Sequence, residues 1–349
     1  MRSPNITDLP VVPNKKGWPW SEGSLNLPEI LPDGQEWPRI SIVTPSYNQG
    51  QFIEETIRSV LLQGYPNFEY FIMDGGSTDD SVEVIKRYDE WLTYWVSEQD
   101  GGQSCAVNNG WKKSTGTIIG WVNSDDLYMP GAFHDVAQTY HDNPKSIVIC
   151  GEAIISDEDL RVKSVKKPYT FDIERLLLGG NVPGQPSVFI VKKVFKEIGG
   201  LDESLHQSMD RDYWVRISMR YPQGPYIYKK KVFAIARDWS GTKTATGFYN
   251  IKKERIRILE KAFSDPEITK ELLDKQAVCF KKVKHRLAIL AQSHAYASIE
   301  AGHTLAAWRY AAESWTLSPS PYGIWHTLRL FIRAIIPRSI TKNRLKGSR

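Results

Sequence analysis

The stretch Gly120-Trp121-Val122-Asn123-Ser124-Asp125-Asp126-Leu127-Tyr128 joins an apolar segment directly to two adjacent carboxylates. Thr117–Val122 is short, apolar and contains β-branched residues, which predicts a buried strand. The polar break after it places Asp125 and Asp126 at the carboxyl end of that strand, where open α/β sheets bind ligands. Because adjacent carboxylates repel each other, a cation or several donors should hold them. The stretch predicts a divalent ion carrying a diphosphate, or alternatively a solvated turn.

Strands and amphipathic helices are predicted to alternate through the first half of the chain. The pattern gives strands at Ile40–Thr44, Glu69–Met73 and Tyr94–Ser97, and a helix at Gln103–Ser114. Such alternation predicts βαβ units and therefore an α/β fold with a mostly parallel central sheet flanked by helices. Each strand ends in small and polar residues, so we expect these polar clusters to meet at one edge of the sheet.

The second half of the pattern is less regular. Further strands are predicted at Ser146–Cys150, Val188–Val191 and Tyr226–Arg237. Residues 151–170 alternate and carry charges, which indicates exposed, irregular β structure, and a helix should begin near Asp210. We therefore predict one domain at residues 39–248, with a first half at 39–150 and a second half at 151–248.

The two ends of the chain differ from this domain in composition. Residues 1–38 are rich in proline and tryptophan, which predicts an extended arm held on the domain by its indoles, or alternatively a disordered leader. Residues 249–349 favour a C-terminal helical extension. No acidic residue follows Glu313, and the basic residues after it are Arg329, Arg333, Arg338, Lys342, Arg344, Lys346 and Arg349. A basic amphipathic helix with such a tail predicts binding to an anionic membrane surface, or else ordinary packing on the core.

Composition narrows the class of protein. The net charge of +5 is modest and gives no reason to expect a nucleic-acid partner. Three scattered cysteines without CxxC spacing argue against a disulfide framework and a zinc site, which fits a cytoplasmic protein. The start lacks the apolar core of a signal peptide, and no stretch approaches the roughly 20 apolar residues of a membrane span. We expect a cytoplasmic protein, peripheral at the inner face of the membrane.

Five motifs follow one another along the chain: Thr44-Pro45-Ser46-Tyr47-Asn48, Asp74-Gly75-Gly76-Ser77-Thr78-Asp79, Asp100-Gly101-Gly102-Gln103, Asn123-Ser124-Asp125-Asp126 and Met209-Asp210-Arg211-Asp212. In order and approximate spacing they resemble the motifs of glycosyltransferase family 2. The resemblance covers roughly residues 39 to 245, and it implies a GT-A fold and transfer of a sugar, with inversion, from a nucleotide diphosphate donor.

The resemblance implies a set of residues that bind the nucleotide sugar. The Asp74 carboxylate suits such a role, because it could accept a hydrogen bond from a pyrimidine N–H. Residues 44–50 contain no GxGxxG, so a dinucleotide-type pyrophosphate cradle is not expected. Gln103 equally fits a capped turn before a helix. The implied donor-binding residues are Thr44, Pro45, Tyr47, Asp74, Asp100, Gln103, Ser124 and Asp125.

The acidic motif corresponds to the metal-binding DXD position of the family, with Asn123 in first place. Asp125 is then the best ligand for Mn²⁺ or Mg²⁺, and Asp126 is its neighbour or a second ligand. Such an ion would neutralise charge on the leaving diphosphate.

A second departure from the family occurs near the end of the domain. Trp239 stands where many relatives carry a histidine. If that histidine ligates metal in relatives, Lys243 or Arg237 could instead hold the phosphates as a fixed cation, and metal dependence could be weak.

Inversion requires a base opposite the leaving group, and Asp210 occupies the family's base position. Its predicted place at a helix start would keep the carboxylate ionised, although an N-cap is the simpler role for an aspartate there. Asp212 could orient the acceptor or pair with Arg211 or Arg216, and Gln185 is a further candidate on the acceptor side. The absence of a QxxRW motif argues against a processive synthase.

Together these features predict an inverting glycosyltransferase. It would move a sugar from a nucleotide diphosphate sugar, first of all a UDP-sugar, to a hydroxyl of a glycan or lipid-linked acceptor in surface polysaccharide or lipopolysaccharide synthesis. An NDP-sugar nucleotidyltransferase is the alternative enzyme, but residues 44–55 contain no Lys or Arg for a basic phosphate loop. A catalytically silent nucleotide-binding scaffold is the alternative outside enzymes.

Overall fold

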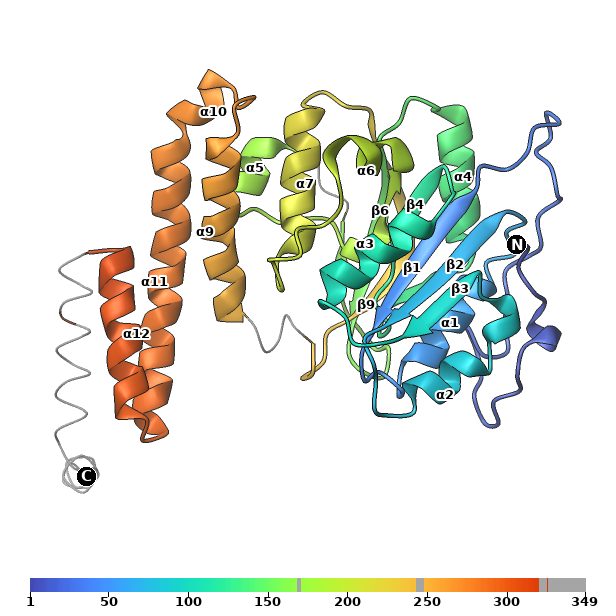
Figure 1. Ribbon diagram of the computed structural model, residues 1–349, viewed down its shortest axis with the longest axis horizontal. Helices are drawn as coiled ribbons and strands as arrows, with labels where there is room; N and C mark the ends of the chain where they lie inside the picture. Colours follow the sequence, from blue (N-terminus) through green and yellow to red (C-terminus); the bar gives the residue numbers. More distant parts are fainter. Residues whose placement is uncertain (168–170, 243–247, 320–324, 326–349) are drawn as a thin grey trace, which may run out of the picture. The chain divides into compact units, whose positions relative to one another are not determined.

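The chain divides into two compact units, each described here by itself (Figure 1). The first unit is Met1–Leu176 with Gly180–Thr246, and the second is Leu177–Gly179 with Gly247–Arg349. Within the part of the chain that the structure describes, no helix is both long and apolar enough to span a bilayer. The computed structural model describes residues 1–167, 171–242, 248–319 and 325.

Four parallel strands form the first half of the sheet, as the alternating pattern predicted, and their order is β3-β2-β1-β4. They are β1 (Ile40–Ser46), β2 (Phe68–Asp74), β3 (Tyr94–Ser97) and β4 (Ile118–Trp121). Ile40 of β1 is in register with Phe68 of β2 and with Ile118 of β4, so the three strands end near one another. The loops that follow them therefore meet at one edge (Figure 1).

Beyond β4 the sheet becomes mixed, in the order β4-β8-β6-β9-β5 with β7 paired to β6. The strands are β5 (Leu127–Tyr128), β6 (Val148–Ser156), β7 (Val162–Lys166), β8 (Val188–Val191) and β9 (Tyr226–Arg237). Strand β8 is antiparallel to both of its neighbours, whereas β6 and β9 are parallel. The strand predicted to end at Cys150 continues to Ser156, because β7 and β9 pair with its second half.

Helices cover both faces of the sheet in the first unit. Ile40 and Ile42 of β1 face the core that α1, α2 and α4 complete, whereas Val43 points to the other face. On that other face α3 comes close to β1, because Gly110 leaves room: a Cβ there would lie 2.5 Å from Cγ2 of Val43. The helices are α1 (Ile53–Leu61), α2 (Ser81–Lys86), α3 (Gln103–Lys113), α4 (Ala132–Asp142), α5 (Ile173–Leu177), α6 (Lys192–Ile198) and α7 (Met209–Arg220).

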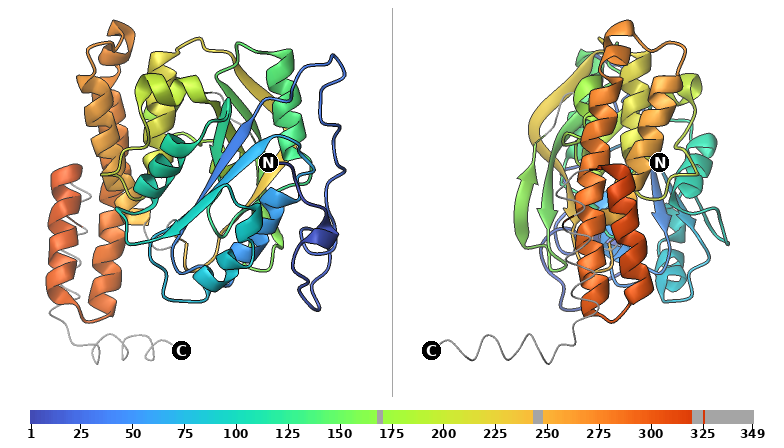
Figure 2. Two further views of the ribbon diagram at one scale, coloured as in Figure 1. Left: turned by 45° about the vertical axis from the view of Figure 1, so that its right-hand side comes forward. Right: turned by 90° about the vertical axis from the view of Figure 1, so that its left-hand side faces the viewer.

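The second unit is helical where it is described. Helices α11 and α12 run side by side in both views of Figure 2, and an ion pair of 2.9 Å between Lys253 and Glu313 joins α9 to α12. Tyr249, Leu287 and Ala291 form its buried centre. The predicted basic tail, from Arg329 onward, lies outside the described residues. The helices are α9 (Phe248–Ser264), α10 (Lys270–Asp274), α11 (Gln276–Glu300) and α12 (Thr304–Leu317).

The proline-rich residues 1–38 run along the outside of the first unit (Figure 2). Arg58 of α1 binds them. The Arg58 side chain is buried and donates hydrogen bonds to the carbonyl oxygens of Pro10 (3.0 Å), Pro19 (2.9 Å) and Trp20 (3.2 Å). Its guanidinium also lies over the Trp20 ring, 5.4 Å from the centroid. One buried cation thus satisfies carbonyl groups that an extended segment cannot satisfy by itself.

Arg58→Met should lower the free energy of unfolding by about 3 kcal/mol, because three carbonyl oxygens would lose their donor. Urea denaturation followed by circular dichroism measures this loss. The control is Arg87→Met, which removes a half-exposed ion pair with Glu54 and should cost less than about 1 kcal/mol. Equal losses in the two variants would contradict this account of how the N-terminal segment is held.

Candidate active site

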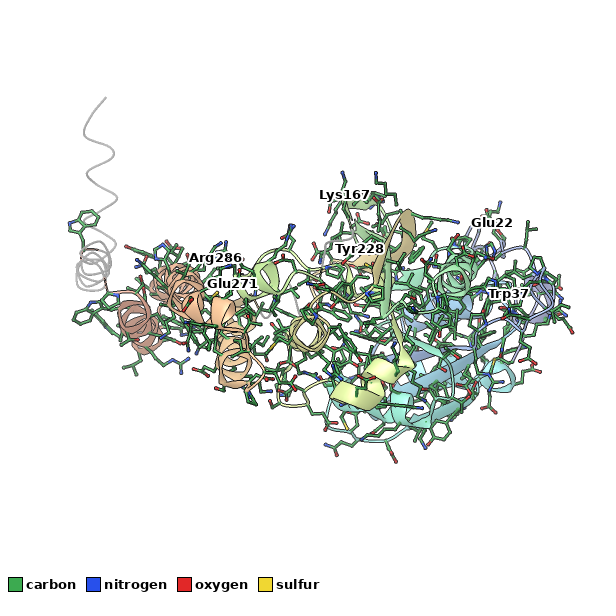
Figure 3. The ribbon with its side chains drawn as sticks, turned by 90° about the horizontal axis from the view of Figure 1, so that it is seen from above. Glu22, Trp37, Lys167, Tyr228, Glu271 and Arg286 are labelled. Atoms are coloured by element: carbon green, nitrogen blue, oxygen red, sulfur yellow. The ribbon has the colours of Figure 1, made fainter. Side chains whose placement is uncertain are left out.

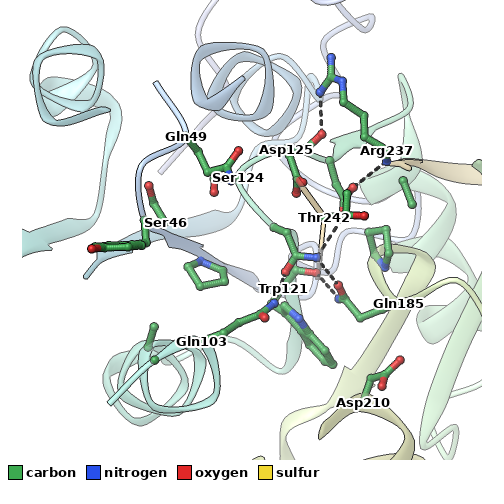
Figure 4. Close-up of a pocket in the computed structure, with 18 of the residues that line it drawn as sticks. Ser46, Gln49, Gln103, Trp121, Ser124, Asp125, Gln185, Asp210, Arg237 and Thr242 are labelled. Carbon is green, nitrogen blue, oxygen red and sulfur yellow. Dashed lines mark hydrogen bonds between the residues drawn. The ribbon is translucent and has the colours of Figure 1, made fainter. Parts of the chain in front are cut away.

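A cavity of about 940 Å³ opens where the parallel strands end (Figure 4). The loops after β1, β2, β3 and β4 contribute to its wall, and so do the residues before β8, the start of α7 and the end of β9. All these segments belong to the first unit. The predicted residues that line the cavity are Pro45, Tyr47, Asp100, Gln103, Ser124, Asp125, Asp126, Gln185, Asp210 and Arg237.

Two residues expected to touch the nucleoside lie behind the cavity wall instead. Thr44 is buried, and its hydroxyl is hydrogen-bonded to that of Tyr70 at 3.0 Å. The buried Asp74 carboxylate accepts hydrogen bonds from Ser77 N (2.8 Å) and Ser97 Oγ (2.7 Å). In this structure Asp74 therefore shapes the loop after β2, while the next residues, Gly75 and Gly76, line the cavity.

Asn123–Asp126, which we call the acidic turn, follows β4 and presents Asp125 and Asp126 to the cavity. Asp125 Oδ2 accepts a hydrogen bond of 3.0 Å from the indole of Trp239. Asp126 is buried, and its two oxygens accept from the Arg237 backbone N–H (2.9 Å) and the Asn123 amide (3.0 Å). Burial, followed by the neighbouring Asp125 carboxylate, raises the pKa of Asp126.

Trp239 packs tightly beside this turn. Its ring makes an edge contact with Phe52, with centroids 5.1 Å apart. Gly241 is required by this packing, because a Cβ there would lie 2.2 Å from the Trp239 ring. An indole N–H donates a hydrogen bond but cannot ligate a metal ion, so Trp239 acts on Asp125 and not on a cation.

The acidic turn suits a divalent ion held by one protein carboxylate. Asp125 lines the cavity, whereas Asp126 has both oxygens engaged within the protein. No group of three His, Cys, Asp or Glu residues suitable for a metal occurs within the described ranges. Mg²⁺ and similar ions bind through one or two carboxylates, substrate phosphates and water, so Asp125 with a donor diphosphate meets that requirement.

The proposed phosphate role of Arg237 is not supported by its contacts. Its side chain is 1% exposed and forms an ion pair with Glu55 of α1. The guanidinium also donates to the carbonyl oxygens of Asp125 (2.6 Å) and Glu158 (3.2 Å). Arg237 therefore positions the acidic turn and does not offer its charge to a ligand. Lys243, the other cation considered, lies outside the described residues.

Asp210 and Gln185 lie across the cavity from Ser46 and Gln103 (Figure 4). Asp210 is in the first turn of α7, and its Oδ1 accepts from the following backbone N–H at 2.7 Å. Gln185 donates to the Trp121 carbonyl oxygen (2.8 Å) and accepts from Asn123 (3.3 Å). Asp212 does not line the cavity; its buried carboxylate pairs with Arg216 at 2.8 Å, one of the alternatives expected for it.

The cavity also contains residues that the sequence did not single out. Lys166 at the end of β7 reaches it because β7 pairs with β6, placing Lys166 opposite Ala153. Asn123, already singled out as the first residue of the acidic motif, is bonded to Gln103 (2.6 Å) as well as to Gln185 and so connects two walls. Besides Lys166, the additions include Gln49, His206 and Gln207. No motif marked them, since their places depend on pairing between distant strands and on loops.

The fold and this cavity define a GT-A type of protein, and comparison with known proteins gives the family. Residues 41–199 match the family model described as Glycosyl transferase family 2. The match to glycosyltransferase family 2 is therefore shown for these residues, which make up less than half of the chain. This match includes four of the five motifs, and the motif of Asp210 lies after it.

Curated relatives carry the same designation. An uncharacterized glycosyltransferase of Rickettsia typhi is 31% identical over 206 residues, which cover 56% of this chain and 64% of the relative. One from Haemophilus influenzae is 26% identical over 235 residues, covering 64% of this chain and 79% of the relative. This chain covers less than two thirds of the length of two of these relatives. The shares are 64% for the Rickettsia typhi protein and 65% for one from Rickettsia prowazekii.

Solved structures confirm the fold. S. aureus TarS in complex with UDP-GlcNAc has a TM-score of 0.52 and 15% identity, with 80% of this chain and 91% of that chain covered. The mannosyltransferase PcManGT from Pyrobaculum calidifontis, in complex with GDP-Man and Mn²⁺, has a TM-score of 0.53 and 20% identity, with 85% and 86% covered. The predicted GT-A fold with C-terminal helices is thus confirmed.

Asp125→Asn should weaken binding of UDP in the presence of Mn²⁺ by about 10-fold or more, because the ion would lose its protein carboxylate. Binding of UDP without metal should change much less. Calorimetry with and without Mn²⁺ measures both values. Asp238→Asn is the matched control, since it removes a second negative charge from the same cavity wall. Equal weakening in both variants would show a general charge effect and contradict ligation by Asp125.

Proposed function

We propose that this chain is an inverting glycosyltransferase that moves a sugar from a nucleotide diphosphate sugar to an acceptor hydroxyl. The observation that carries the proposal is one cavity lined by Asp125 and by Asp210, together with Pro45, Tyr47 and Asp100. A volume of about 940 Å³ is large enough for a sugar nucleotide and part of an acceptor. The PcManGT and TarS complexes with sugar nucleotides support this class of donor.

The donor would occupy the side of the cavity formed by the parallel strands. Pro45, Tyr47 and Asp100 would contact the nucleoside, and the diphosphate would lie at the acidic turn. Thr44 and Asp74 would support these contacts from behind. A divalent ion on Asp125 would supply positive charge to the departing diphosphate.

Asp210 would act as the general base. The acceptor oxygen attacks the anomeric carbon as its proton passes to the Asp210 carboxylate, and the bond from that carbon to the diphosphate oxygen breaks with its electron pair. In Figure 4 Gln185 lies between Asp125 and Asp210, which supports a base on the side away from a diphosphate bound at Asp125. The start of α7 stabilises a carboxylate through the helix dipole and its own N–H donors.

The acceptor would be a glycan or a lipid-linked sugar in the assembly of surface polysaccharide or lipopolysaccharide. Gln185 would border its site. The three-part organisation at residues 1–38, 39–248 and 249–349 then assigns catalysis to the middle part. The basic residues after Glu313 would bring the enzyme to an anionic membrane where such acceptors are found.

A donor screen tests the reaction. The protein with Mn²⁺, a panel of UDP- and GDP-sugars and lipid-linked acceptors should release the nucleoside diphosphate. Asp210→Asn should keep donor affinity but lower kcat by about 10²- to 10⁴-fold, because no base takes the acceptor proton. Asp238→Asn, the same exchange at another carboxylate of the cavity, is the control.

Other products of the same screen identify the alternatives. Full activity in Asp210→Asn would mean that another group is the base. Pyrophosphate released from UTP and a sugar phosphate would indicate a nucleotidyltransferase. Nucleotide binding without any turnover would indicate a scaffold.

A triple variant in which glutamine replaces Arg329, Arg333 and Arg338 should bind vesicles that contain anionic lipid about 100-fold more weakly. Each lost charge removes about 1 kcal/mol of binding free energy. Vesicle sedimentation measures the loss. The control is a triple variant in which glutamine replaces the exposed Lys281, Lys282 and Lys284 of α11, because it loses the same number of positive charges. If both triple variants bind alike, net charge and not the tail determines membrane binding.

A further inference from the structure

A continuous set of contacts joins the N-terminal segment to the acidic turn. The indole N–H of Trp20 donates to Oε1 of Glu55 in α1 at 2.9 Å. The other oxygen of Glu55 forms an ion pair with the guanidinium of Arg237 in β9. Arg237 in turn donates from its side chain to the Asp125 carbonyl oxygen (2.6 Å) and from its backbone to Asp126 Oδ1 (2.9 Å).

The middle of this set is shielded from water. The Glu55 side chain is 13% exposed and the Arg237 side chain 1%. The guanidinium carbon of Arg237 lies 4.7 Å from the centroid of the Phe52 ring, which also contacts Trp239. Hydrogen bonds between such shielded charged groups hold both side chains in one orientation. A charge that moved away from its partner would find no water to replace that partner.

Helix α1 also holds the last residue of the acidic turn and strand β5, which follows the turn. Thr56 Oγ1 donates to the Asp126 carbonyl oxygen at 2.7 Å, and Ser59 Oγ accepts from the Tyr128 backbone N–H at 3.1 Å. The orientation of α1 and the position of Arg237 therefore both determine where the Asp125 carboxylate lies. Trp20 of the N-terminal segment contributes to both, since its indole binds Glu55 directly.

We propose that Trp20, Glu55 and Arg237 are positioning residues for sugar transfer, through which the N-terminal segment fixes the acidic turn. The proposal goes beyond the proposed function and rests on it in one respect, the binding of the donor diphosphate at this turn. The three residues do not touch substrate. They hold the Asp125 backbone, so that its carboxylate meets the diphosphate without reorganisation when charge develops there.

The test compares Trp20→Phe and Glu55→Gln with Trp37→Phe. Trp37 lies in the same N-terminal segment (Figure 3), and its indole donates to the Pro28 carbonyl oxygen at 3.0 Å. The control thus loses one indole hydrogen bond that does not lead to the acidic turn. Thermal unfolding of each variant verifies that it is folded.

Two measurements report whether the acidic turn has moved: the Trp239 indole resonance and the turnover kinetics. In protein labelled with ¹⁵N-tryptophan, the Trp239 indole resonance, assigned with Trp239→Phe, reports its hydrogen bond to Asp125 without any need for activity. It should shift in Trp20→Phe and Glu55→Gln and stay in place in Trp37→Phe. In turnover assays kcat should fall about 10-fold in the first two variants. KM for the donor should change less, because the nucleoside contacts remain.

The outcomes separate this proposal from the proposed function. An unmoved Trp239 resonance in both test variants, or the same shift in Trp37→Phe, overturns the positioning proposal. A selective shift in a protein that transfers no sugar from any donor supports the connection to the turn and overturns the proposed function alone. A fall in kcat that Trp37→Phe shows equally indicates general loss of structure and also overturns the positioning proposal.

Discussion

The buried ion pair between Glu55 and Arg237 connects the two halves of the sheet at the acidic turn. Glu55 comes from the helix after β1, whereas Arg237 ends β9, far away in sequence. Burying both charges costs free energy, and the additional hydrogen bonds of Arg237 to carbonyl oxygens offset part of that cost. Such a pair contributes little net stability, but it permits few alternative positions. The geometry of Asp125 and Asp126 follows from it.

The mixed sheet explains how one cavity obtains two chemically different sides. The parallel strands bring together loops with small and polar residues, which suits a nucleotide at their carboxyl ends. The antiparallel strand β8 reverses the chain direction, so that Gln185, just before it, faces the end of β4 through its bond to Trp121. Helix α7 then adds Asp210. A purely parallel sheet would not deliver these residues to the same edge.

The elements that could be predicted from sequence are those with strong local periodicity. Strands β1 to β4 and helix α3 were predicted within a few residues, and the aspartates that follow strands were expected at one edge. Strand β5, only Leu127–Tyr128, has no periodicity of its own and exists because it pairs with Ile235 and Ala234. Lys166 reaches the cavity for the same kind of reason. The burial of Arg237 was missed because its partner, Glu55, is 182 residues away in sequence.

Trp239 shows how an indole can hold a carboxylate in place. A histidine beside Asp125 could share a cation with it, whereas the indole can only donate a hydrogen bond to Oδ2. That bond fixes the carboxylate before any ion binds, but it occupies one acceptor position of the Oδ2 atom. Phe52 supports the Trp239 ring on one side, and Gly241 makes room for it. Because the same Phe52 ring also covers the Arg237 guanidinium, the backbone and the side chain of Asp125 are fixed by a single packed cluster.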